Sequence, residues 1–524
     1  MASTEGSDYF LVTKILDVDT SEGQLGQFKD RETLDEWIPP SQASNINLFK
    51  AAELLRARHG YVTPVAFPTE TVYGLGADAT HSDAVKGIYK VKGRPSDNPL
   101  IVHVCDLSML REIICPGYLE KLRQGLSYPD PIPTIYQNLI KRFWPGPLTI
   151  ILPNPRNSKL VPEVTAGLST FGARMPDSPL ALSLICLTGQ PLAAPSANAS
   201  TRPSPTTAQH VLHDLNGKIH LIVNGGASSC RFGVESTVVD GLCHPPVILR
   251  PGGISIEAIR EVSDWEDVQN AYQDSKEVPG SLNAPRAPGM KYKHYSPKAK
   301  VVLYESVCFR SDTTTTSTTP SNLLNPNNDE IKNNGHSSYP LQSKYTPWRL
   351  MGSEYLLPHM QNSNKANNDD KINHSSSISS ELLIKIGILS TKHWESWGWL
   401  HDSIVISDAN YLKIGQISKI QNLRMISTTS KLRKSELWLK TVPFSDSTQS
   451  FDKSLKAKND WKCADVYEIS LGPDTQQIAH DLFTALREMD EQKVEVILIE
   501  GIDDKGGLAA AIMNRLRKAA AVIK

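Results

Sequence analysis

The sequence predicts an α/β protein with two domains, and three observations support this fold class. The chain has 524 residues, more than one ordinary hydrophobic core accommodates. Short apolar segments typical of strands alternate with amphipathic segments typical of helices over residues 45–262, and again after residue 300. In the first region strands outnumber helices, which favours a mixed sheet. In the second, strand–helix–strand–helix order favours a small Rossmann-like sheet with helices on its faces.

The first region follows a polar, weakly patterned segment, residues 1–44, which we interpret as an N-terminal extension. A helix is expected over residues 45–60, where leucine and alanine recur at helical spacing and Gly60 ends the pattern. Further elements are expected at the following positions. Helices are expected over 82–90, 179–187 and 206–217, and strands over 61–69, 100–104, 147–152, 191–195, 219–226, 235–241 and 245–253.

Residues 263–299 are polar and are interpreted as a connector to the second domain, residues 300–524. Two stretches rich in Asn, Ser and Thr, at about 311–340 and 361–380, are too polar to bury a core, and we interpret them as disordered insertions. The remaining pattern predicts strands over 300–306, 382–390, 403–407 and 494–502, and helices over 474–492 and 506–523.

Composition excludes several classes of protein. The formal net charge of −1 argues against bulk coating of nucleic acid, so any RNA contact would be local and weak. The seven cysteines are scattered, which favours reduced, intracellular thiols. No apolar run reaches membrane-spanning length, and no signal peptide is predicted. A cytoplasmic location is expected; a mitochondrial pool stays open, although the acidic residues near the start are unfavourable for a transit peptide.

Familiar nucleotide and hydrolase motifs are absent from the sequence. It contains no GxxxxGK[ST], no HExxH, no GxSxG and no GxGxxG after a strand. A nucleotide site would therefore have to be built from other residues.

One loop concentrates positive charge just before a predicted strand. The segment KVKGRPSDNPLIVHV holds Lys92, Arg94 and Asn98, with His103 at the far end of the strand. Cations fixed among prolines at a strand end suggest a bound anion, and phosphate is the commonest candidate. The alternative is a solvated charge cluster beside a core histidine, and for His103 alone that alternative is favoured.

Three other segments offer polar groups at strand ends. Thr71 follows a strand in FPTETVYGLGADA. Arg174 stands between apolar neighbours, so it needs either an internal or a ligand carboxylate as partner, and both stay open. The rigid, small-residue loop AAPSANASTRPSPT carries Ser196, Asn198 and Ser204 before a helix whose free N–H groups could hold phosphate. Ser236 and Arg250 lie near opposite ends of two adjacent strands.

Taken in order, these motifs resemble the YrdC-like threonylcarbamoyl-AMP synthases. The resemblance rests on PTETVYGLG, KGRPSDNPLIVHV, FWPGPLT, ARMPDSP, APSANASTRPSPT, GVESTVVD, LRPGGIS and APGMKYKHYSP, covers roughly residues 46–260, and continues through the connector. The connector and the second α/β domain match the long two-domain form of the family. The resemblance implies a twisted mixed sheet with helices around a concave basic site.

The resemblance also implies an activity and a set of site residues. The family is a nucleotidyltransferase family that condenses L-threonine, bicarbonate or CO₂ and ATP to L-threonylcarbamoyladenylate and pyrophosphate. The product supplies the machinery that makes threonylcarbamoyladenosine in ANN-decoding tRNAs. Mg²⁺ is expected to enter with ATP, and no metal site is expected in the protein itself. The implied threonine pocket is Thr71, His103, Arg174, the backbone at Ala194, and Ser236. The implied ATP contacts are Lys92, Arg94, Asn98, Thr170, Ser196, Asn198, Ser204, Arg250 and Tyr295.

The residues themselves agree with that chemistry. A carbamate and the α-phosphate of ATP are both anionic, so their approach requires neutralising charge, and Lys92 and Arg94 are the expected catalytic cations. The connector motif GMKYKHYSP is too aromatic for a passive linker. The resemblance suggests that it crosses the mouth of the first domain, where it would act as a gate; the alternative is a tether with incidental aromatic residues. Two other classes are considered. One is an RNA-binding module without chemistry, which the near-neutral charge disfavours. The other is a carbamoyltransferase or hydrogenase-maturation relative that shares the catalytic domain, which the cysteine pattern excludes.

Overall fold

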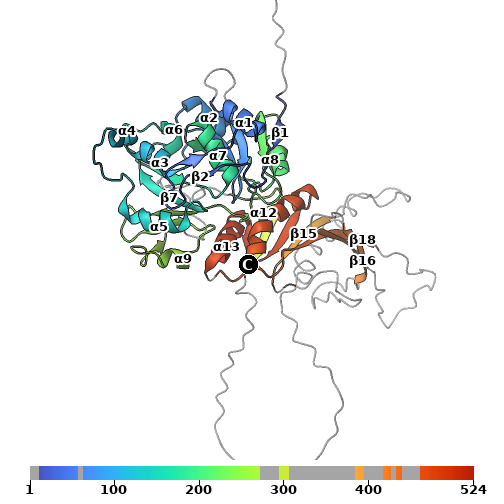
Figure 1. Ribbon diagram of the computed structural model, residues 1–524. Helices are drawn as coiled ribbons and strands as arrows, with labels where there is room; N and C mark the ends of the chain where they lie inside the picture. Colours follow the sequence, from blue (N-terminus) through green and yellow to red (C-terminus); the bar gives the residue numbers. More distant parts are fainter. Residues whose placement is uncertain are drawn as a thin grey trace, which may run out of the picture. The chain divides into compact units, whose positions relative to one another are not determined.

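The computed structural model describes residues 11–56, 63–271, 294–305, 384–392, 394, 417–425, 432–439, 461–504 and 506–524 (Figure 1). The chain divides into two compact units, and each is described by itself. The first comprises Met1–Val301, Leu471–Glu495 and Asp504–Val522, and the second comprises Val302–Ser470, Val496–Asp503 and Ile523–Lys524.

The first unit is built on an 11-stranded mixed sheet, as the sequence predicts. The β4–β5 and β7–β8 pairs are antiparallel, whereas β6 and β8 run parallel. The strand order is β1 (Lys14–Asp17), β10 (Leu221–Asn224), β4 (Val65–Pro68), β5 (Tyr73–Asp78), β9 (Leu192–Ala193), β6 (Ile101–His103), β8 (Thr170–Arg174), β7 (Leu148–Pro153), β11 (Thr237–Asp240), β12 (Val247–Arg250) and β13 (Gln269–Asn270).

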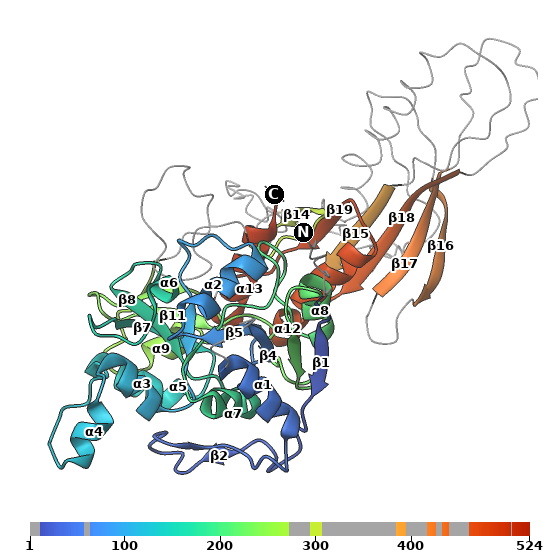
Figure 2. The ribbon, with the colours of Figure 1, turned by 90° about the horizontal axis from the view of Figure 1, so that it is seen from above.

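Helices cover this sheet where their apolar faces meet it. Helices α1 (Ile46–Arg56) and α7 (Pro179–Thr188) pack against each other and against β4, and they lie side by side in Figures 1 and 2. Helix α2 (Ser82–Lys92) packs on β5, and α8 (Ala208–Leu215) packs on β10. The remaining helices of the sheet region are α3 (Leu107–Ile114), α4 (Tyr118–Arg123), η1 (Thr134–Tyr136), α5 (Gln137–Phe143), α6 (Pro162–Thr165) and α9 (Ile256–Arg260).

The segment interpreted as an N-terminal extension contributes to this fold over residues 11–44. Strand β1 pairs with β10 at the edge of the sheet, and β2 (Gln27–Phe28) pairs with β3 (Trp37–Ile38). Phe28 and Trp37 are buried in the main hydrophobic core. The sequence signal is weak because these strands are only two to four residues long and polar residues separate them. Residues 1–10 lie outside the described residues.

Two further features of the first unit concern its strands. Gly74 and Gly76 lie inside β5, and a Cβ at Gly76 would come within 2.6 Å of the Phe67 ring, so this position requires glycine. Strand β13 and the buried Trp265 continue the first unit beyond residue 262, where we expected the connector to begin. Gly60 and connector residues 272–293 lie outside the described residues.

The last two helices also belong to the first unit, although the sequence places them within the predicted second domain, residues 300–524. They are α12 (Thr475–Glu491) and α13 (Gly507–Ala519), and they pack against each other. Each buries an arginine that pairs with a carboxylate of the sheet region: Arg487 with Asp214, and Arg515 with Glu235. The first unit is therefore completed by residues more than 200 positions away in sequence.

The second unit contains most of a seven-stranded sheet. Its centre is parallel, as predicted, since β15 pairs in parallel with β18 and β19, but β16 and β17 extend it in antiparallel fashion. The order is β16 (Ile417–Met425), β17 (Leu432–Leu439), β18 (Trp461–Ser470), β15 (Ile384–Ser390), β19 (Val496–Glu500), β14 (Lys300–Tyr304) and β20 (Val522–Ile523). Residues 311–340, 361–380 and 403–407 lie outside the described residues. Among described helices, none has the length and hydropathy needed to span a membrane.

Candidate active site

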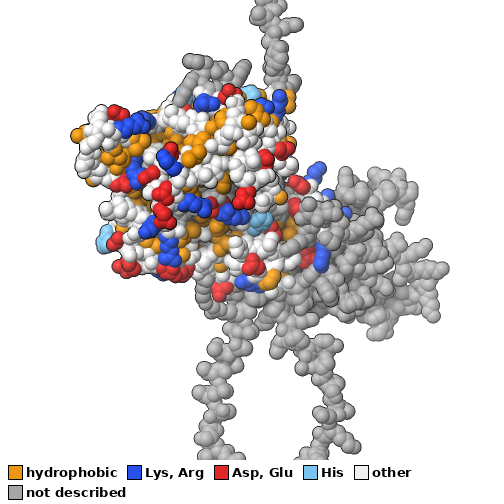
Figure 3. Space-filling model, in the orientation of Figure 1, with side chains coloured by type: hydrophobic (Ala, Val, Ile, Leu, Met, Phe, Trp, Pro, Cys, Tyr) orange, Lys and Arg blue, Asp and Glu red, His pale blue; other side chains and the backbone are white. Residues whose placement is uncertain are grey.

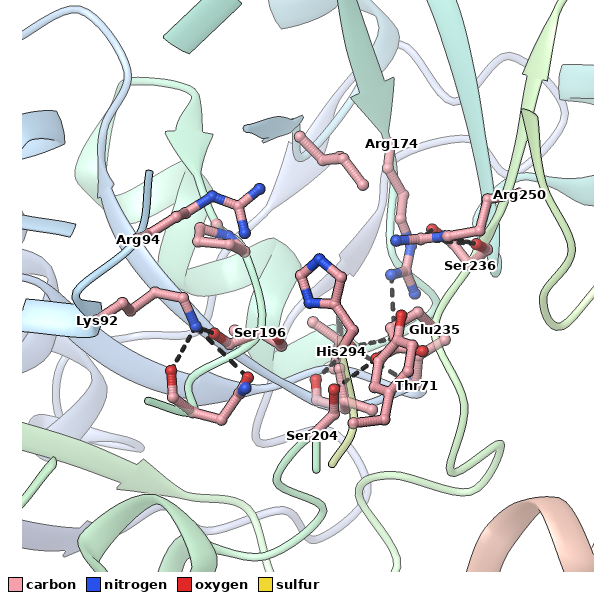
Figure 4. Close-up of a pocket in the computed structure, with 18 of the residues that line it drawn as sticks. Thr71, Lys92, Arg94, Arg174, Ser196, Ser204, Glu235, Ser236, Arg250 and His294 are labelled. Atoms are coloured by element: carbon pink, nitrogen blue, oxygen red, sulfur yellow. Dashed lines mark hydrogen bonds between the residues drawn. The ribbon is translucent and has the colours of Figure 1, made fainter. Parts of the chain in front are cut away.

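The first unit contains a cavity with about 740 Å³ of empty space, into which most of the predicted site residues project (Figure 4). Its walls come from the strand ends of the mixed sheet, the C-terminus of α2, the loop after β9, and residues 294–295. The predicted residues on its lining are Thr71, Lys92, Arg94, His103, Arg174, Ala194, Ser196, Asn198, Ser204, Ser236, Arg250 and Tyr295.

Asn98 and Thr170 do not line this cavity. Asn98 is buried, and its backbone carbonyl accepts hydrogen bonds from the Tyr89 hydroxyl at 3.1 Å and from Arg94 Nε at 3.3 Å. Thr170 begins β8, where it is in register with Pro153 of β7. In this structure Asn98 therefore supports Arg94 through its backbone, and the predicted ATP contacts of Asn98 and Thr170 stay predictions.

Lys92 lies at the end of α2, against the loop that follows β9. Its ammonium donates to the carbonyl oxygens of Ser196 and Asn198 and lies 3.4 Å from Asn198 Oδ1. Burial, and then the neighbouring charge of Arg94, lower the pKa of Lys92 well below its ordinary value. A phosphate in the cavity would counteract this shift, because an opposite charge favours the ammonium form.

Arg94 turns toward the same space and is only partly buried. Its Nη2 donates to the Pro99 carbonyl at 3.1 Å. Loss of hydration lowers the pKa of Arg94 to about 10, so it stays protonated at neutral pH. Figure 4 shows Lys92 and Arg94 on one side of the drawn cavity and Arg174 and Arg250 on the other. The cations thus surround a common space.

The sequence left open whether Arg174 pairs with an internal carboxylate or with a ligand carboxylate. In the structure it has an internal carboxylate partner, Glu70. Its Nη2 donates to Glu70 Oε1 at 2.6 Å, Nη1 donates to Thr71 Oγ1 at 3.0 Å, and Nε donates to the Gly146 carbonyl at 3.2 Å. A guanidinium has five N–H groups, and these bonds use three of them. One N–H on each terminal nitrogen therefore remains for a ligand carboxylate.

The other residues of the predicted threonine pocket line the same cavity as Arg174. His103 is buried on the cavity wall, and its pKa falls to about 3 because of burial and then the Arg174 charge, so the ring is neutral at neutral pH. The Ser236 hydroxyl lies 2.8 Å from Thr149 Oγ1 and accepts from Arg250 Nη2 at 3.1 Å. The Ala194 N–H already donates to Ile101, so its carbonyl is the backbone group that could meet a substrate amine.

The connector supplies two aromatic residues to the cavity. Tyr295 is buried with φ +64°, a left-handed conformation uncommon for tyrosine, and its ring stacks on Phe483 at 5.3 Å between centroids. The backbone N–H of Ser296 donates to the Thr201 carbonyl at 2.7 Å and anchors this turn. His294 lines the cavity, and its Nε2 has no hydrogen-bond partner among the described residues.

Some lining residues were not on the predicted list of contacts. They are Thr69, Val72, Gly74, Ile101, Pro195, Ser200, Thr201, Glu235 and His294. Glu235 is the least expected of them, because a carboxylate opposes the binding of an anion. Its position directly before Ser236 in GVESTVVD was the available signal. Burial alone would raise its pKa, but the charges of Arg515 and Arg250 outweigh this and lower it.

The described part of the chain offers no cluster of three or more His, Cys, Asp or Glu residues that could hold a metal ion. The carboxylates nearest the cavity, Glu70 and Glu235, are engaged with Arg174 and Arg515.

Fold and cavity together define an α/β protein whose concave, cation-rich site has the charges to hold a small carboxylate ligand beside a phosphate-bearing one. The comparisons with known proteins assign this chain to the threonylcarbamoyl-AMP synthase family. The family described as "Threonylcarbamoyl-AMP synthase, C-terminal domain" matches residues 254–521, and the family described as "Telomere recombination" matches residues 60–252.

Individual relatives agree with this assignment. A threonylcarbamoyl-AMP synthase of Schizosaccharomyces pombe is 38% identical over 494 residues, which span 93% of this chain and 91% of that protein. One from Bacillus subtilis is 50% identical over 256 residues, which span 49% of this chain and 66% of that protein. The crystal structure of P. abyssi Sua5 complexed with L-threonine has a TM-score of 0.56 and 29% identity, covering 98% of this chain and all of that one.

Proposed function

We propose that this protein is a threonylcarbamoyl-AMP synthase, which converts L-threonine, bicarbonate or CO₂ and ATP to L-threonylcarbamoyladenylate and pyrophosphate. The observation that carries the proposal is that one cavity holds both the Arg174–Thr71–His103 cluster and the cations Lys92, Arg94 and Arg250. The names of the relatives, and the L-threonine in the P. abyssi Sua5 structure, support the same activity.

The part of the site that would bind threonine, here called the threonine half, consists of Thr71, His103, Arg174, Ala194 and Ser236. It would act by orienting the substrate. The two remaining N–H groups of Arg174 would hold the substrate carboxylate, and Thr71 and Ser236 offer hydroxyls beside it. Neutral His103 can accept or donate a hydrogen bond without adding charge. The substrate amine is then left to react. Its nitrogen bonds to the carbon of CO₂, with release of one proton to solvent, or to the carbon of bicarbonate, with loss of water, and either route gives a carbamate.

The part of the site that would bind ATP, here called the nucleotide half, contains Lys92, Arg94, Ser196, Asn198, Ser204, Arg250 and Tyr295. Its cations would act by neutralising negative charge. A carbamate oxygen attacks the α-phosphorus of ATP, the bond from that phosphorus to the β-phosphate oxygen breaks, and pyrophosphate leaves. Lys92, Arg94 and Arg250 would offset the repulsion between the two anions and the charge that develops on the leaving group. Ser196, Asn198 and Ser204 would position the phosphates. No general base is assigned, since the carbamate is already a nucleophile.

Mg²⁺ is proposed to enter as part of the ATP substrate. It would neutralise the triphosphate, and the protein residues described above would orient the nucleotide around it.

The product is an adenylate that water hydrolyses, so we propose that it passes to the enzyme that modifies ANN-decoding tRNA. Figure 3 shows basic and acidic side chains interspersed on the face drawn, which fits at most a local RNA contact. A direct RNA contact and the cytoplasmic location stay predictions.

The test of this function is pyrophosphate release by the full chain. The protein is incubated with Mg²⁺, ATP, L-threonine and bicarbonate, and pyrophosphate is measured with a coupled pyrophosphatase assay. Release that stops when either threonine or bicarbonate is left out supports the proposal. A folded preparation that binds threonine and ATP but releases no pyrophosphate contradicts it.

A further inference from the structure

A buried arginine outside the cavity joins several of the residues that form its nucleotide half. Arg515, on α13, is 1% exposed and does not line the cavity. Its Nε donates to Glu235 Oε2 at 3.1 Å, and its Nη1 donates to the carbonyl of Pro251. Its guanidinium carbon lies 5.7 Å from the centre of the Tyr295 ring. Arg515 thereby links two strand ends and the connector.

Each of these partners of Arg515 either is a predicted ATP contact, follows one in the sequence, or is hydrogen-bonded to one. Pro251 follows Arg250 directly. The other carboxylate oxygen of Glu235 accepts a hydrogen bond from the hydroxyl of Ser204, a predicted ATP contact. Tyr295 itself lines the cavity, between Arg515 and the ring of Phe483. A displacement of Arg515 would therefore move the nucleotide half. In the threonine half, Arg174 is held instead by its hydrogen bonds to Glu70, Thr71 and the Gly146 carbonyl.

Charge gives Arg515 a second role. Glu235 is a buried carboxylate on the wall of a cavity otherwise surrounded by cations. Left unpaired, it would repel phosphate and partly cancel the attraction of Arg250. With its ion pair to Arg515 it is neutralised from behind, so the cavity presents a net positive charge to its ligand.

We propose that Arg515 is a positioning residue for ATP: through Glu235, Pro251 and Tyr295 it holds the nucleotide half of the site together, and it neutralises Glu235, the carboxylate among the described cavity-lining residues, which would oppose phosphate binding there. The choice of ATP as ligand rests on the proposed function. By this inference, the C-terminal helix of the chain is part of the active-site scaffold.

The experiment measures binding of Mg-ATP and of L-threonine separately by calorimetry, without bicarbonate, so that no turnover is needed. Arg515→Met removes the charge, and Glu235→Gln with Arg515→Met removes both members of the pair. Arg517→Met is the matched control, because Arg517 lies on the same helix and pairs with Asp504, away from the cavity residues. Circular dichroism and thermal unfolding report whether each variant is folded.

We expect Arg515→Met to weaken ATP binding by about tenfold or more, since it leaves a buried charge without its partner. Threonine binding should stay within about twofold of the parent. The double variant should regain part of the lost ATP affinity, because it removes the unpaired charge but does not restore the contacts to Pro251 and Tyr295. Arg517→Met should bind like the parent. ATP binding by Arg515→Met within about twofold of the parent overturns the proposal, as does equal loss of threonine affinity or no recovery in the double variant.

A pH comparison separates charge from general loosening. The groups that face Glu235 are Arg515 from α13, Arg250 from β12, Ser204 from the loop after β9, and His294 and Tyr295 from the connector. Without Arg515, burial favours the uncharged form of Glu235. The ATP affinity of Arg515→Met relative to the parent should then be closer to normal at pH 6 than at pH 8. The same relative loss at both pH values overturns the charge argument.

Two further outcomes are a variant that does not fold and a parent protein that shows no turnover. If Arg515→Met does not fold, Arg515→Lys takes its place: it keeps the charge but cannot reach all three partners. Weaker ATP binding with unchanged threonine binding then supports the proposal, and parent-like ATP binding overturns it. If the parent binds both ligands but releases no pyrophosphate, the proposed function fails, whereas the binding comparison still decides the role of Arg515.

Discussion

Replacing Arg174 by methionine should affect stability and threonine binding through separable mechanisms. Arg174 and Glu70 are both buried, and the ion pair between them is 2.6 Å long. Removing one member of a buried pair typically costs about 3–5 kcal/mol, because the other charge is left uncompensated. The free energy of unfolding of Arg174→Met, measured with urea, should fall by about that amount.

A second substitution separates the two effects. In Glu70→Gln with Arg174→Met no buried charge is left unpaired, so most of the stability should return, to within about 2 kcal/mol of the parent. The threonine affinity should not return, because the two N–H groups that would hold the substrate carboxylate are gone. Charge-assisted hydrogen bonds contribute about 1.5–3 kcal/mol each, so the Kd for threonine should rise about a hundredfold or more.

The matched control uses another buried pair of the same kind. Arg487 donates to Asp214 at 2.9 Å, and both side chains are buried, but neither residue lines the cavity. Arg487→Met should also destabilise the protein, although by less, because Asp214 keeps Arg202 at 3.4 Å and His213 at 3.1 Å as partners. Threonine binding, measured by calorimetry, should stay nearly unchanged. The reasoning is refuted if the double variant of Glu70 and Arg174 binds threonine within about threefold of the parent.

Three further predictions concern the cations, the connector and pH. Arg94→Ala should leave the unfolding free energy nearly unchanged but reduce pyrophosphate release by about a hundredfold, because one phosphate-facing cation is lost; parent-like turnover would return Arg94 to the role of a solvated surface residue. Tyr295→Ala should raise the KM for ATP more than that for threonine and increase release of free AMP by hydrolysis, if the connector shields the adenylate; an unchanged ratio of adenylate to AMP would show that it only joins domains. His103, His210 and His294 each have a pKa lowered to about 3 by burial. Their contribution to stability is therefore complete above about pH 6.5 and is lost as pH falls, by up to about 1.4 kcal/mol per group at pH 5.5. Urea denaturation should show this loss, with a shallower slope for His210→Gln, and equal stability at pH 7.5 and 5.5 would contradict it.

The site could be predicted from the sequence largely because its residues lie in short polar motifs at strand ends. Lys92, Arg94, Ser196, Asn198 and Ser204 stand in segments whose small residues, prolines and charges are unusual beside buried strands. The local sequence is therefore enough to mark these residues as candidates for a binding site. The family resemblance added roles that the residue types alone did not assign.

What could not be predicted depends on pairing between distant segments. Strand β1 is only four residues long and is placed by its parallel pairing with β10. Gly76 is explained by the ring of Phe67 on the neighbouring strand.

The active-site scaffold extends beyond residues 45–262 for the same reason. Trp265 is part of the core, and Arg515 reaches Glu235 from a helix 280 residues later. In the sequence, an arginine within the apolar stretch AAIMNRLRKA was the only hint of a buried ion pair. Cutting the chain after the connector would therefore also remove α12 and α13. For this reason point substitutions such as Tyr295→Ala are the better test of the connector.

The most direct test of the proposed activity follows the atoms of all three substrates into one product. The full chain is incubated with ¹³C-bicarbonate, ¹⁵N-threonine and ATP labelled in the adenine ring, and the products are analysed by mass spectrometry under conditions that limit hydrolysis. The proposed chemistry predicts a single adenylate that contains all three labels, formed in equal amount with pyrophosphate. An adenylate without the ¹³C label, or pyrophosphate released with no labelled adduct, would contradict it.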